Sequence, residues 1–374
     1  MTYEIGDLPL QVLLRAVGRA EDQLARLDEA VRRSRVGEGF TERAHFFEAA
    51  ATMWVGGELV HIEDLVLHDA RMDVRAPTHE LTIAHGVLRA RRRIAGAKAD
   101  WAIGDAGLGT LTGYVEQDRL EPLPVGERDD ACLEIEPGVS GVDDPLAREL
   151  ANVDALLDRS RELIERLSGS PGPNARDRAP LAVGDLMIRD PDWDEQDRLV
   201  QWKRTLRDVG QFPASLAAAI LWDAWEYLEP MQRQHWLGGQ LVSAYLRAHG
   251  KVTSHLFSFN VGLKVIPRER RRAPGRATRL IAFLDAMSAS ADAGMKDVAR
   301  LSRAREQMER RLRGRRISSS LPVVVELILA RPIVSAAMVA QAAAVTPRAA
   351  LNLVGELGVR EVTGRGRYRA WGIL

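Results

Sequence analysis

Guanidinium groups bind phosphate oxygens through paired, charge-assisted hydrogen bonds. Four of them lie within ten residues near the end of the chain, at Arg360, Arg365, Arg367 and Arg369. If this stretch forms a hairpin, the two-residue period of a strand puts Arg365, Arg367 and Arg369 on one face, where they can follow a phosphate backbone together. Such a hairpin is favoured because glycines and aromatic residues alternate with the charges.

Just before this stretch, the spacing of apolar residues predicts a short helix over residues 334–345. Ser335 is expected to be its N-cap, because a serine hydroxyl can accept a hydrogen bond from a free amide of the first turn. Met338, Val339 and Ala342 share the face that we expect to be buried.

A second helix is predicted over residues 347–357. Thr346 is a good N-cap, proline suits the first helical position, and a glycine follows the last apolar residue. Its inward residues are expected to be Ala350, Leu351, Val354 and Leu357, and its outward residues Arg348, Ala349, Asn352 and Glu356. Arg348 and Asn352 lie one turn apart and can form bidentate contacts with base edges.

Helix, turn, helix and basic hairpin, in this order, resemble a winged helix-turn-helix domain. The resemblance implies double-stranded DNA as the partner, with Arg348 and Asn352 reading bases and the four arginines of 360–369 holding phosphates. A small helical domain used only for packing or dimerisation is the alternative. A homodimer is left open by the sequence.

The charge distribution agrees with a polyanionic partner. The whole chain is neutral, with 52 basic and 52 acidic residues. Residues 264–374 carry 22 Lys and Arg against 9 Asp and Glu, a net charge of +13, and residues 1–263 carry 30 against 43, a net charge of −13. Such an asymmetry between the halves favours nucleic acid as a partner of the basic part. The basic runs at 268–272 and 303–316 also fit solvated faces or ion-pair partners of the acidic half.

The stretch 229–242, EPMQRQHWLGGQLV, resembles the nucleotide-binding signature of the Fic family, H-P-F-x-[DE]-G-N-G-R-x-x-R. The apolar residues 213–228 resemble the helix that precedes the signature in that family. The family's histidine base then corresponds to Glu229, its magnesium-binding acid to Arg233, its asparagine to His235, and its two phosphate-binding arginines to Leu237 and Gln240. Its proline is kept as Pro230.

These replacements predict that the Fic-like cleft has lost its chemistry. An arginine at the position of the metal ligand repels magnesium, and without both phosphate-binding arginines ATP loses its charge partners. We therefore expect no enzyme activity, no bound metal and no cofactor. The alternatives are a divergent nucleotidyl (AMP) transferase that uses Glu229 as its base, and an antitoxin-like module that binds a protein partner through the cleft.

Two further segments resemble the same class of protein. Residues 48–70 are similar to the inhibitory segment [ST]-x-x-x-E-[GN] of many Fic proteins, with Thr52 and Gly57 at the outer positions and Gly56 in place of the glutamate. Residues 72–94 resemble an uncharacterised bacterial family that joins a Fic-like region to a helix-turn-helix. That resemblance implies no particular reaction.

The expected fold is mainly α, with a Fic-like helical core and a C-terminal winged helix-turn-helix domain. We divide the chain into an N-terminal helical region at 1–100, a loop-rich region at 101–194, the degenerate Fic-like core at 195–316 and the winged helix-turn-helix at 317–374. Helices are expected at 10–34, 41–56, 78–97, 146–167, 197–208, 213–227, 236–249, 277–293 and 296–312. Residues 102–145 are expected to be a loop and 168–180 a linker.

Composition narrows the class further. A single cysteine, Cys132, excludes an intramolecular disulfide framework. The histidines at 61, 68, 79 and 85 lack the spacing of a metal site. No apolar run reaches 18 residues and the start does not read as a secretory signal, so we expect a cytoplasmic protein without a membrane partner. Together these observations predict a DNA-binding regulator of transcription.

Overall fold

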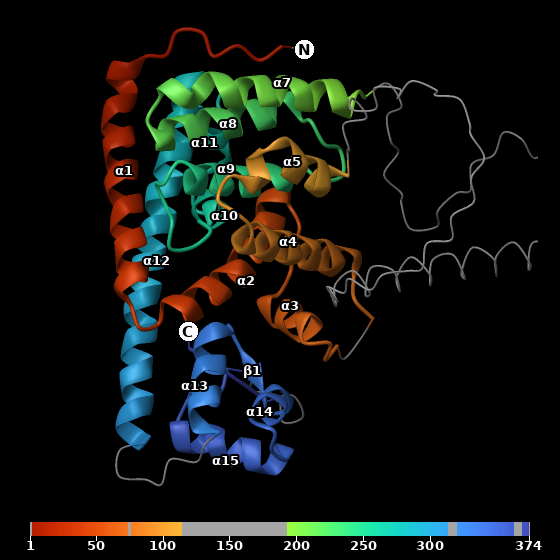
Figure 1. The fold of residues 1–374 in the computed structure, drawn as a ribbon, viewed down its shortest axis with the longest axis vertical. Helices are drawn as coiled ribbons and strands as arrows, with labels where there is room; N and C mark the ends of the chain where they lie inside the picture. Colours follow the sequence, from red (N-terminus) through yellow and green to blue (C-terminus); the bar gives the residue numbers. More distant parts are fainter. Residues whose placement is uncertain (1, 74–75, 114–192, 313–319, 363–368, 374) are drawn as a thin grey trace, which may run out of the picture. The chain divides into compact units, whose positions relative to one another are not determined.

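The computed structural model describes residues 2–73, 76–113, 193–312, 320–362 and 369–373, which belong to one structural unit. The fold is mainly α (Figure 1). The α-helices of the first half are α1 (Leu10–Arg33), α2 (Gly37–Gly56), α3 (Ile62–Asp69), α4 (His79–Gly96) and α5 (Asp105–Thr112). Those that follow are α7 (Glu195–Asp208), α8 (Ala214–Leu228), α9 (Leu237–Ala248), α10 (Phe259–Leu263), α11 (Arg268–Arg271) and α12 (Arg276–Leu312). The last part holds α13 (Leu321–Ala330), β1 (Val334–Ser335), α14 (Ala336–Ala343), α15 (Pro347–Leu357) and β2 (Ala370–Trp371).

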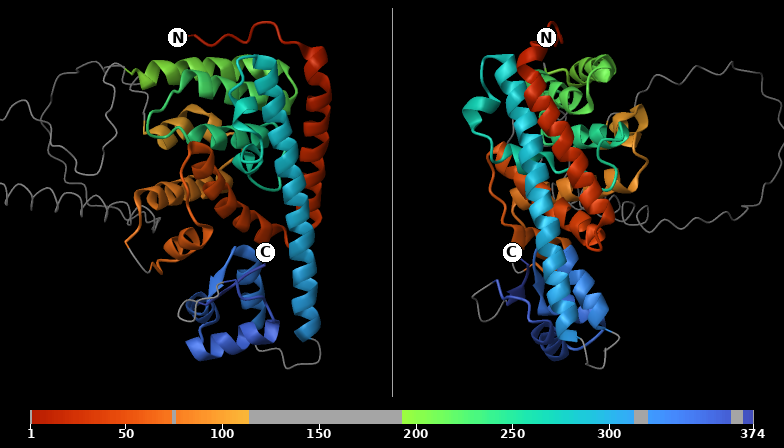
Figure 2. Two further views of the ribbon diagram at one scale, coloured as in Figure 1. Left: turned by 180° about the vertical axis from the view of Figure 1, so that it is seen from behind. Right: turned by 90° about the vertical axis from the view of Figure 1, so that its left-hand side faces the viewer.

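Helices α1 and α12 run side by side (Figures 1 and 2). The pairing follows from the sequence of α1, whose apolar residues recur every three or four positions and form one buried stripe that includes Leu13, Leu24 and Leu27. Helix α12 also packs against α8, α10 and the C-terminal helices. It therefore joins the helical core to the end of the chain.

The structure corrects one prediction about α12. We expected two helices, at 277–293 and 296–312, separated at Gly294, but the helix is continuous from Arg276 to Leu312. Gly294 lies against α1, because a Cβ at this position would come within 2.9 Å of Leu27 Cδ1. Glycine costs about 1 kcal/mol in a helix interior, and here the close packing of the two helices offsets that cost.

Helix α8 is largely buried. Almost all of its residues are buried, as expected for a helix that is apolar on every side. Trp225 packs edge-on against Trp202 of α7, with the ring centroids 5.4 Å apart. On the other side, Gly238 of α9 lies flat against the Trp225 ring, since a Cβ there would be only 2.4 Å from it.

A buried polar network joins α2, α4, α9 and α10. Arg91 Nη1 donates to Gln240 Oε1 over 2.7 Å, and Arg91 Nη2 donates to the Leu256 carbonyl over 2.9 Å. The Glu48 carboxylate accepts from the backbone N–H of Asn260 over 2.9 Å. Burial raises the pKa of Glu48, while the Arg91 charge and these hydrogen bonds act in the opposite direction. Charged groups without solvent are tolerated here because most of their polar atoms are paired.

The remaining helix predictions are confirmed to within a few residues. Helices α1, α2, α4, α7, α8 and α9 occupy the predicted positions. The predicted loop at 102–145 is wrong at its start, because Asp105–Thr112 forms α5. The rest of that loop, the helix predicted at 146–167 and the linker at 168–180 lie outside the described residues.

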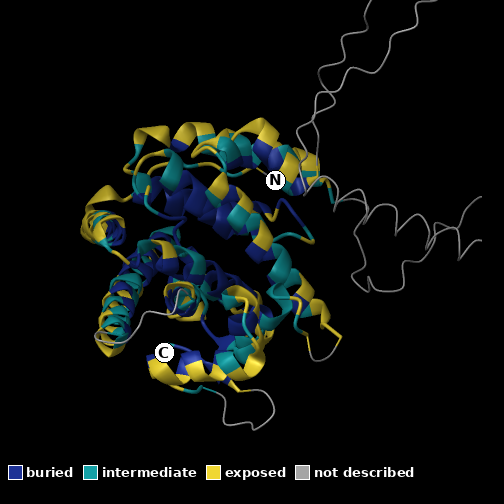
Figure 3. Ribbon diagram, turned by 60° about the horizontal axis from the view of Figure 1, so that its bottom comes forward, coloured by how far each residue is buried: buried dark blue, intermediate teal, exposed yellow. Residues whose placement is uncertain are grey.

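Buried residues line the interior between the helices, and exposed residues cover their outer faces (Figure 3). Among the described helices, none combines the length and the apolar character that a membrane span requires.

Candidate nucleic-acid interface

The C-terminal residues form a compact helical module around α13, α14 and α15. Ser335 caps α14 by accepting from the Met338 N–H over 3.2 Å, and Thr346 caps α15 by accepting from the Ala349 N–H over 3.3 Å. Between the two helices, Ala344 adopts a left-handed conformation with φ of 52°. Both predicted N-caps are confirmed, and α15 has the predicted bounds.

Two details of the predicted packing are wrong. In α14, Met338 and Val339 are buried as expected, but Ala340 completes the buried face and Ala342 is exposed. In α15, Leu353 is buried, whereas Leu351 is 39% exposed. The other three predicted inward residues of α15 are buried, so Leu353 takes the place of Leu351 in the buried face.

The exposed face of α15 carries the predicted base-reading residues. Arg348 and Asn352 are both exposed and lie one turn apart. Leu351 lies one turn from Arg348 and is 39% exposed, so that its apolar side chain can contact a thymine methyl group. No partner for the Arg348 side chain occurs in the part of the chain that the structure describes. The face thus offers a guanidinium, an amide and an apolar group to an external ligand.

The stem of the predicted hairpin is paired. Val362 N–H donates to the Ala370 carbonyl over 2.8 Å, and Gly372 N–H donates to the Arg360 carbonyl over 3.1 Å. On its other edge β2 pairs with β1 in antiparallel register, Val334 opposite Trp371. The tip, with Arg365 and Arg367, lies outside the described residues.

Arg360 and Arg369 of this stem differ in their surroundings. Arg369 Nη2 donates to Glu361 Oε2 over 2.6 Å, and its guanidinium lies 5.3 Å from the centroid of the Trp371 ring. The hydrogen bond and the charge of Arg369 lower the pKa of Glu361. Arg360 is exposed, and no acidic partner is found for it within the described ranges. Of the two, Arg360 is therefore the cation that is free to bind an external anion.

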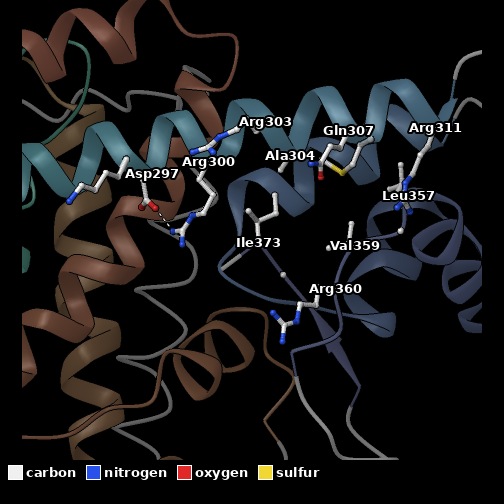
Figure 4. A pocket seen from close by; sticks show the side chains of 14 residues that line it. Asp297, Arg300, Arg303, Ala304, Gln307, Arg311, Leu357, Val359, Arg360 and Ile373 are labelled. Carbon is white, nitrogen blue, oxygen red and sulfur yellow. Dashed lines mark hydrogen bonds and ion pairs between the residues drawn. The ribbon is translucent and has the colours of Figure 1, made fainter.

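Helix α12 brings further cations next to this module. A cavity of about 630 Å³ lies between α12 and the residues around Gly358 (Figure 4). The basic residues that line it are Lys296, Arg300, Arg303, Arg311 and Arg360. Its acidic residue, Asp297, is paired with Arg300. Arg303 Nε donates to the Ala299 carbonyl of its own helix, and Lys296 and Arg311 have no acidic partner among the described residues.

Arg311 connects this cavity to the exposed face of α15. It lies against Gly358, where a Cβ would come within 1.1 Å of its Nη1 atom. A shallow groove next to α15 is lined by Arg311 together with Leu351 and Asn352. The cations of α12 that have no acidic partner among the described residues thus adjoin the exposed face of α15. The basic run at 303–316 is visible in the sequence, but its place beside α15 is not, because only the packing of α12 on α15 brings the two together.

Helix α13 was not predicted, although its sequence carries a clear signal. Leu321, Val324, Val325 and Ile328 are buried at helical spacing, and a proline occupies the first turn. The helix contacts α2, where Gly39 allows Leu329 to approach so closely that a Cβ would lie 3.0 Å from the Leu329 Cβ. Arg43 Nη1 adds a hydrogen bond of 2.7 Å to the Arg331 carbonyl.

Several residues of the stretch that resembles the Fic signature are buried or hydrogen-bonded within the fold. Gln240 is buried. Its Oε1 accepts a hydrogen bond from Arg91, and its Nε2 donates to Thr52 Oγ1 over 3.3 Å. Leu237 and Pro230 are also buried. Glu229 ends α8 in a left-handed conformation with φ of 43°, and its carbonyl accepts from Trp193 Nε1 over 3.1 Å.

The two remaining positions lie nearer the surface. Arg233 is exposed. His235 Nε2 lies 2.9 Å from Glu226 Oε1. Burial disfavours the charged form of His235, but the hydrogen bond and charge of Glu226 outweigh it and raise the pKa of the imidazole. Within the described residues, no group of three or more His, Cys, Asp or Glu side chains could hold a metal ion.

Comparison with known proteins places this geometry in context. Residues 321–374 match the model of an HTH DNA binding domain, and residues 187–313 match the model described as "Protein of unknown function (DUF1612)". Segments of the chain are 26% and 29% identical to the ribosomal RNA small subunit methyltransferase A of Shewanella amazonensis and of Cupriavidus pinatubonensis. These matches cover 33% and 29% of this chain and 46% and 36% of the two enzymes.

The whole chain is also similar to the "Uncharacterized protein y4cF" of Sinorhizobium fredii, with 45% identity over 384 positions that cover all of both proteins. An identity of this extent over full length shows common descent of the entire chain rather than of one domain. The chain therefore belongs to the family of y4cF, with a DUF1612 region followed by a C-terminal helix-turn-helix DNA-binding domain.

Proposed function

We propose that this protein is a transcriptional regulator that reads double-stranded DNA with α15. The observation that carries the proposal is the exposed face of α15, where Arg348, Leu351 and Asn352 stand together on the second helix of a helix-turn-helix domain. Arginine and asparagine recognise guanine and adenine in the major groove through bidentate hydrogen bonds. A helix of this width fits that groove.

Phosphate contacts come from both sides of α15 in this proposal. Arg303 and Arg311 of α12 and Arg360 of the hairpin stem are exposed beside the helix and lack acidic partners among the described residues. We propose that the hairpin is a wing, that Arg365 and Arg367 add to the same phosphate track, and that Arg369 joins them by exchanging Glu361 for a phosphate. Phosphate contacts of this kind set register and affinity, whereas sequence selection rests on the α15 face.

Selection of bound duplexes from a randomised pool tests this proposal. The full chain should enrich a defined motif, and Arg348→Ala with Asn352→Ala should bind with a flattened preference, because each bidentate contact discriminates by about 1–3 kcal/mol. Arg204→Ala with Arg207→Ala is the matched control, since both arginines are exposed on α7. The proposal fails if the α15 variant enriches the same motif as the control.

A structured RNA helix should be included as a competitor in that experiment, because part of the chain is similar to ribosomal RNA methyltransferases. In A-form RNA the major groove is too narrow for side chains to read. A helix that reads the major groove should therefore prefer the DNA duplex. Stronger competition by the RNA would move the assignment to RNA binding.

We further propose that the helical core is a degenerate Fic-like domain without nucleotide transfer. The supporting observation is the hydrogen bond from Gln240, at the position of the second signature arginine, to Thr52, on the helix that resembles the inhibitory segment. Leu237 and Gln240 are occupied in packing and cannot hold phosphates without leaving the interior. Calorimetry should find no magnesium-dependent ATP binding. Micromolar binding that is lost in Glu229→Ala would favour the divergent transferase.

A further inference from the structure

A second cavity, of about 420 Å³, lies among α2, α10 and α12. Its volume falls in the range of small-molecule sites. The walls are mostly apolar and include Phe40, Phe47, Val60, Ile62, Val261 and Ala293. Such walls suit an aromatic ring or an acyl chain rather than a sugar or a free phosphate.

The wall of this cavity also holds polar side chains, among them Ser258 and His255. Ser258 Oγ is buried and finds no hydrogen-bond partner among the described residues. His255 is also buried, and burial lowers its pKa to about 4, so that its ring is neutral at pH 7. Its ring stands edge-on to Phe40, with the centroids 5.3 Å apart.

A cation stands at the edge of the same cavity. Lys264 is exposed, and its Nζ lies 5.6 Å from the centroid of the Trp54 ring. No carboxylate pairs with Lys264 in the described part of the chain. The other cation of the lining, Arg300, is already paired with Asp297. The unpaired charge at the edge is therefore positive.

We propose that this cavity binds a small organic acid, with an aryl or acyl body between the apolar walls and its carboxylate next to Lys264. The position is suited to an effector. Helix α2 forms part of the cavity and also holds the C-terminal module through Gly39 and Arg43. The assignment does not depend on the DNA-binding proposal, because the binding can be measured without DNA.

Titration of the full chain with 8-anilinonaphthalene-1-sulfonate, an aromatic anion that fluoresces in apolar sites, tests the proposal. Wild-type protein should bind it at one saturable site. Ala293→Trp, which fills the cavity from α12, should weaken binding by about tenfold or more. Ala299→Trp, at an exposed position of the same helix outside the cavity, should leave binding unchanged. Equal affinities of the two tryptophan variants would overturn the proposal.

A second variant tests whether binding needs the positive charge at the edge of the cavity. It also keeps the proposal testable if Ala293→Trp does not fold. Lys264→Gln should weaken binding of the probe by about threefold or more, since it removes the cation from the edge. Lys98→Gln, at an exposed lysine of another surface, is the control. Dodecanoate should displace the probe, and dodecyltrimethylammonium should not. Displacement by both ligands, or no difference between the two lysine variants, would contradict the assignment.

Discussion

The helical core and the proposed DNA-binding surface use their charged residues in opposite ways. In the core, Arg91 and Glu48 are fully buried, and neighbouring residues supply hydrogen bonds to both. At the surface, Arg303, Arg311 and Arg348 are exposed, and the described part of the chain offers them no acidic partner. The contrast indicates that the core charges hold the fold, whereas the surface cations are available to a polyanion.

The largest expected effect is a loss of stability when a buried charge of the core is removed. Arg91→Met removes the cation that faces Glu48 and leaves a buried carboxylate without its counter-charge, which costs about 3–5 kcal/mol of stability. Chemical denaturation measures the loss. Arg89→Met, at an exposed position of the same helix, is the control and should change stability by about 0.5 kcal/mol or less. A loss below about 1 kcal/mol in Arg91→Met would refute the structural role of the pair.

The next effect concerns pH and the buried imidazole of His255. Burial lowers the pKa of His255 to about 4, below the value of about 6.5 for an exposed histidine. The unfolded chain therefore binds this proton first as the pH falls, so the folded state loses stability between pH 6.5 and pH 4. The contribution of this group is about 3 kcal/mol at the acid end.

Denaturation of His255→Gln at a series of pH values checks that assignment. The variant should be less stable at pH 7 and should lose less stability than wild type between pH 6.5 and pH 4. Parallel pH curves for the two proteins would show that His255 does not titrate in this window.

A smaller effect is expected within the C-terminal module, whose stability depends on backbone geometry. Ala344 adopts a left-handed conformation at the end of α14, which disfavours any residue with a Cβ. Ala344→Gly should stabilise the protein by about 0.5–1 kcal/mol. Ala342→Gly, two residues earlier inside the helix, should instead destabilise it by about 1 kcal/mol. The same sign of change in both variants would contradict this account.

Sequence patterns predicted the elements whose signal is local. Both ends of helix α15 were predicted at the correct residues, because Thr346 and Pro347 mark its start and Gly358 marks its end. Helix α1 followed from a long amphipathic repeat. The break predicted at Gly294 was wrong because the role of this glycine depends on Leu27, which is far away in the sequence.

The residues that α15 contributes to the candidate site were predictable from the sequence, but the residues that α12 contributes were not. Arg348 and Asn352 were identified from helical spacing alone, and the structure places both on the exposed face. Leu351 was assigned to the wrong face, because helical periodicity fixes a buried stripe only to within about one residue. That Arg303 and Arg311 belong to the same surface required knowledge of how α12 packs on α15.

The salt dependence of DNA binding tests the central claim most directly. Each phosphate contact contributes about −0.9 to the slope of log affinity against log salt concentration. Arg303→Ala with Arg311→Ala and Arg360→Ala should weaken binding to all duplexes and reduce the slope by about 3. A control with the same change in net charge, Arg15→Ala with Arg204→Ala and Arg207→Ala, should leave the slope unchanged. Equal slopes for the two triple variants would contradict the assignment of this surface to DNA.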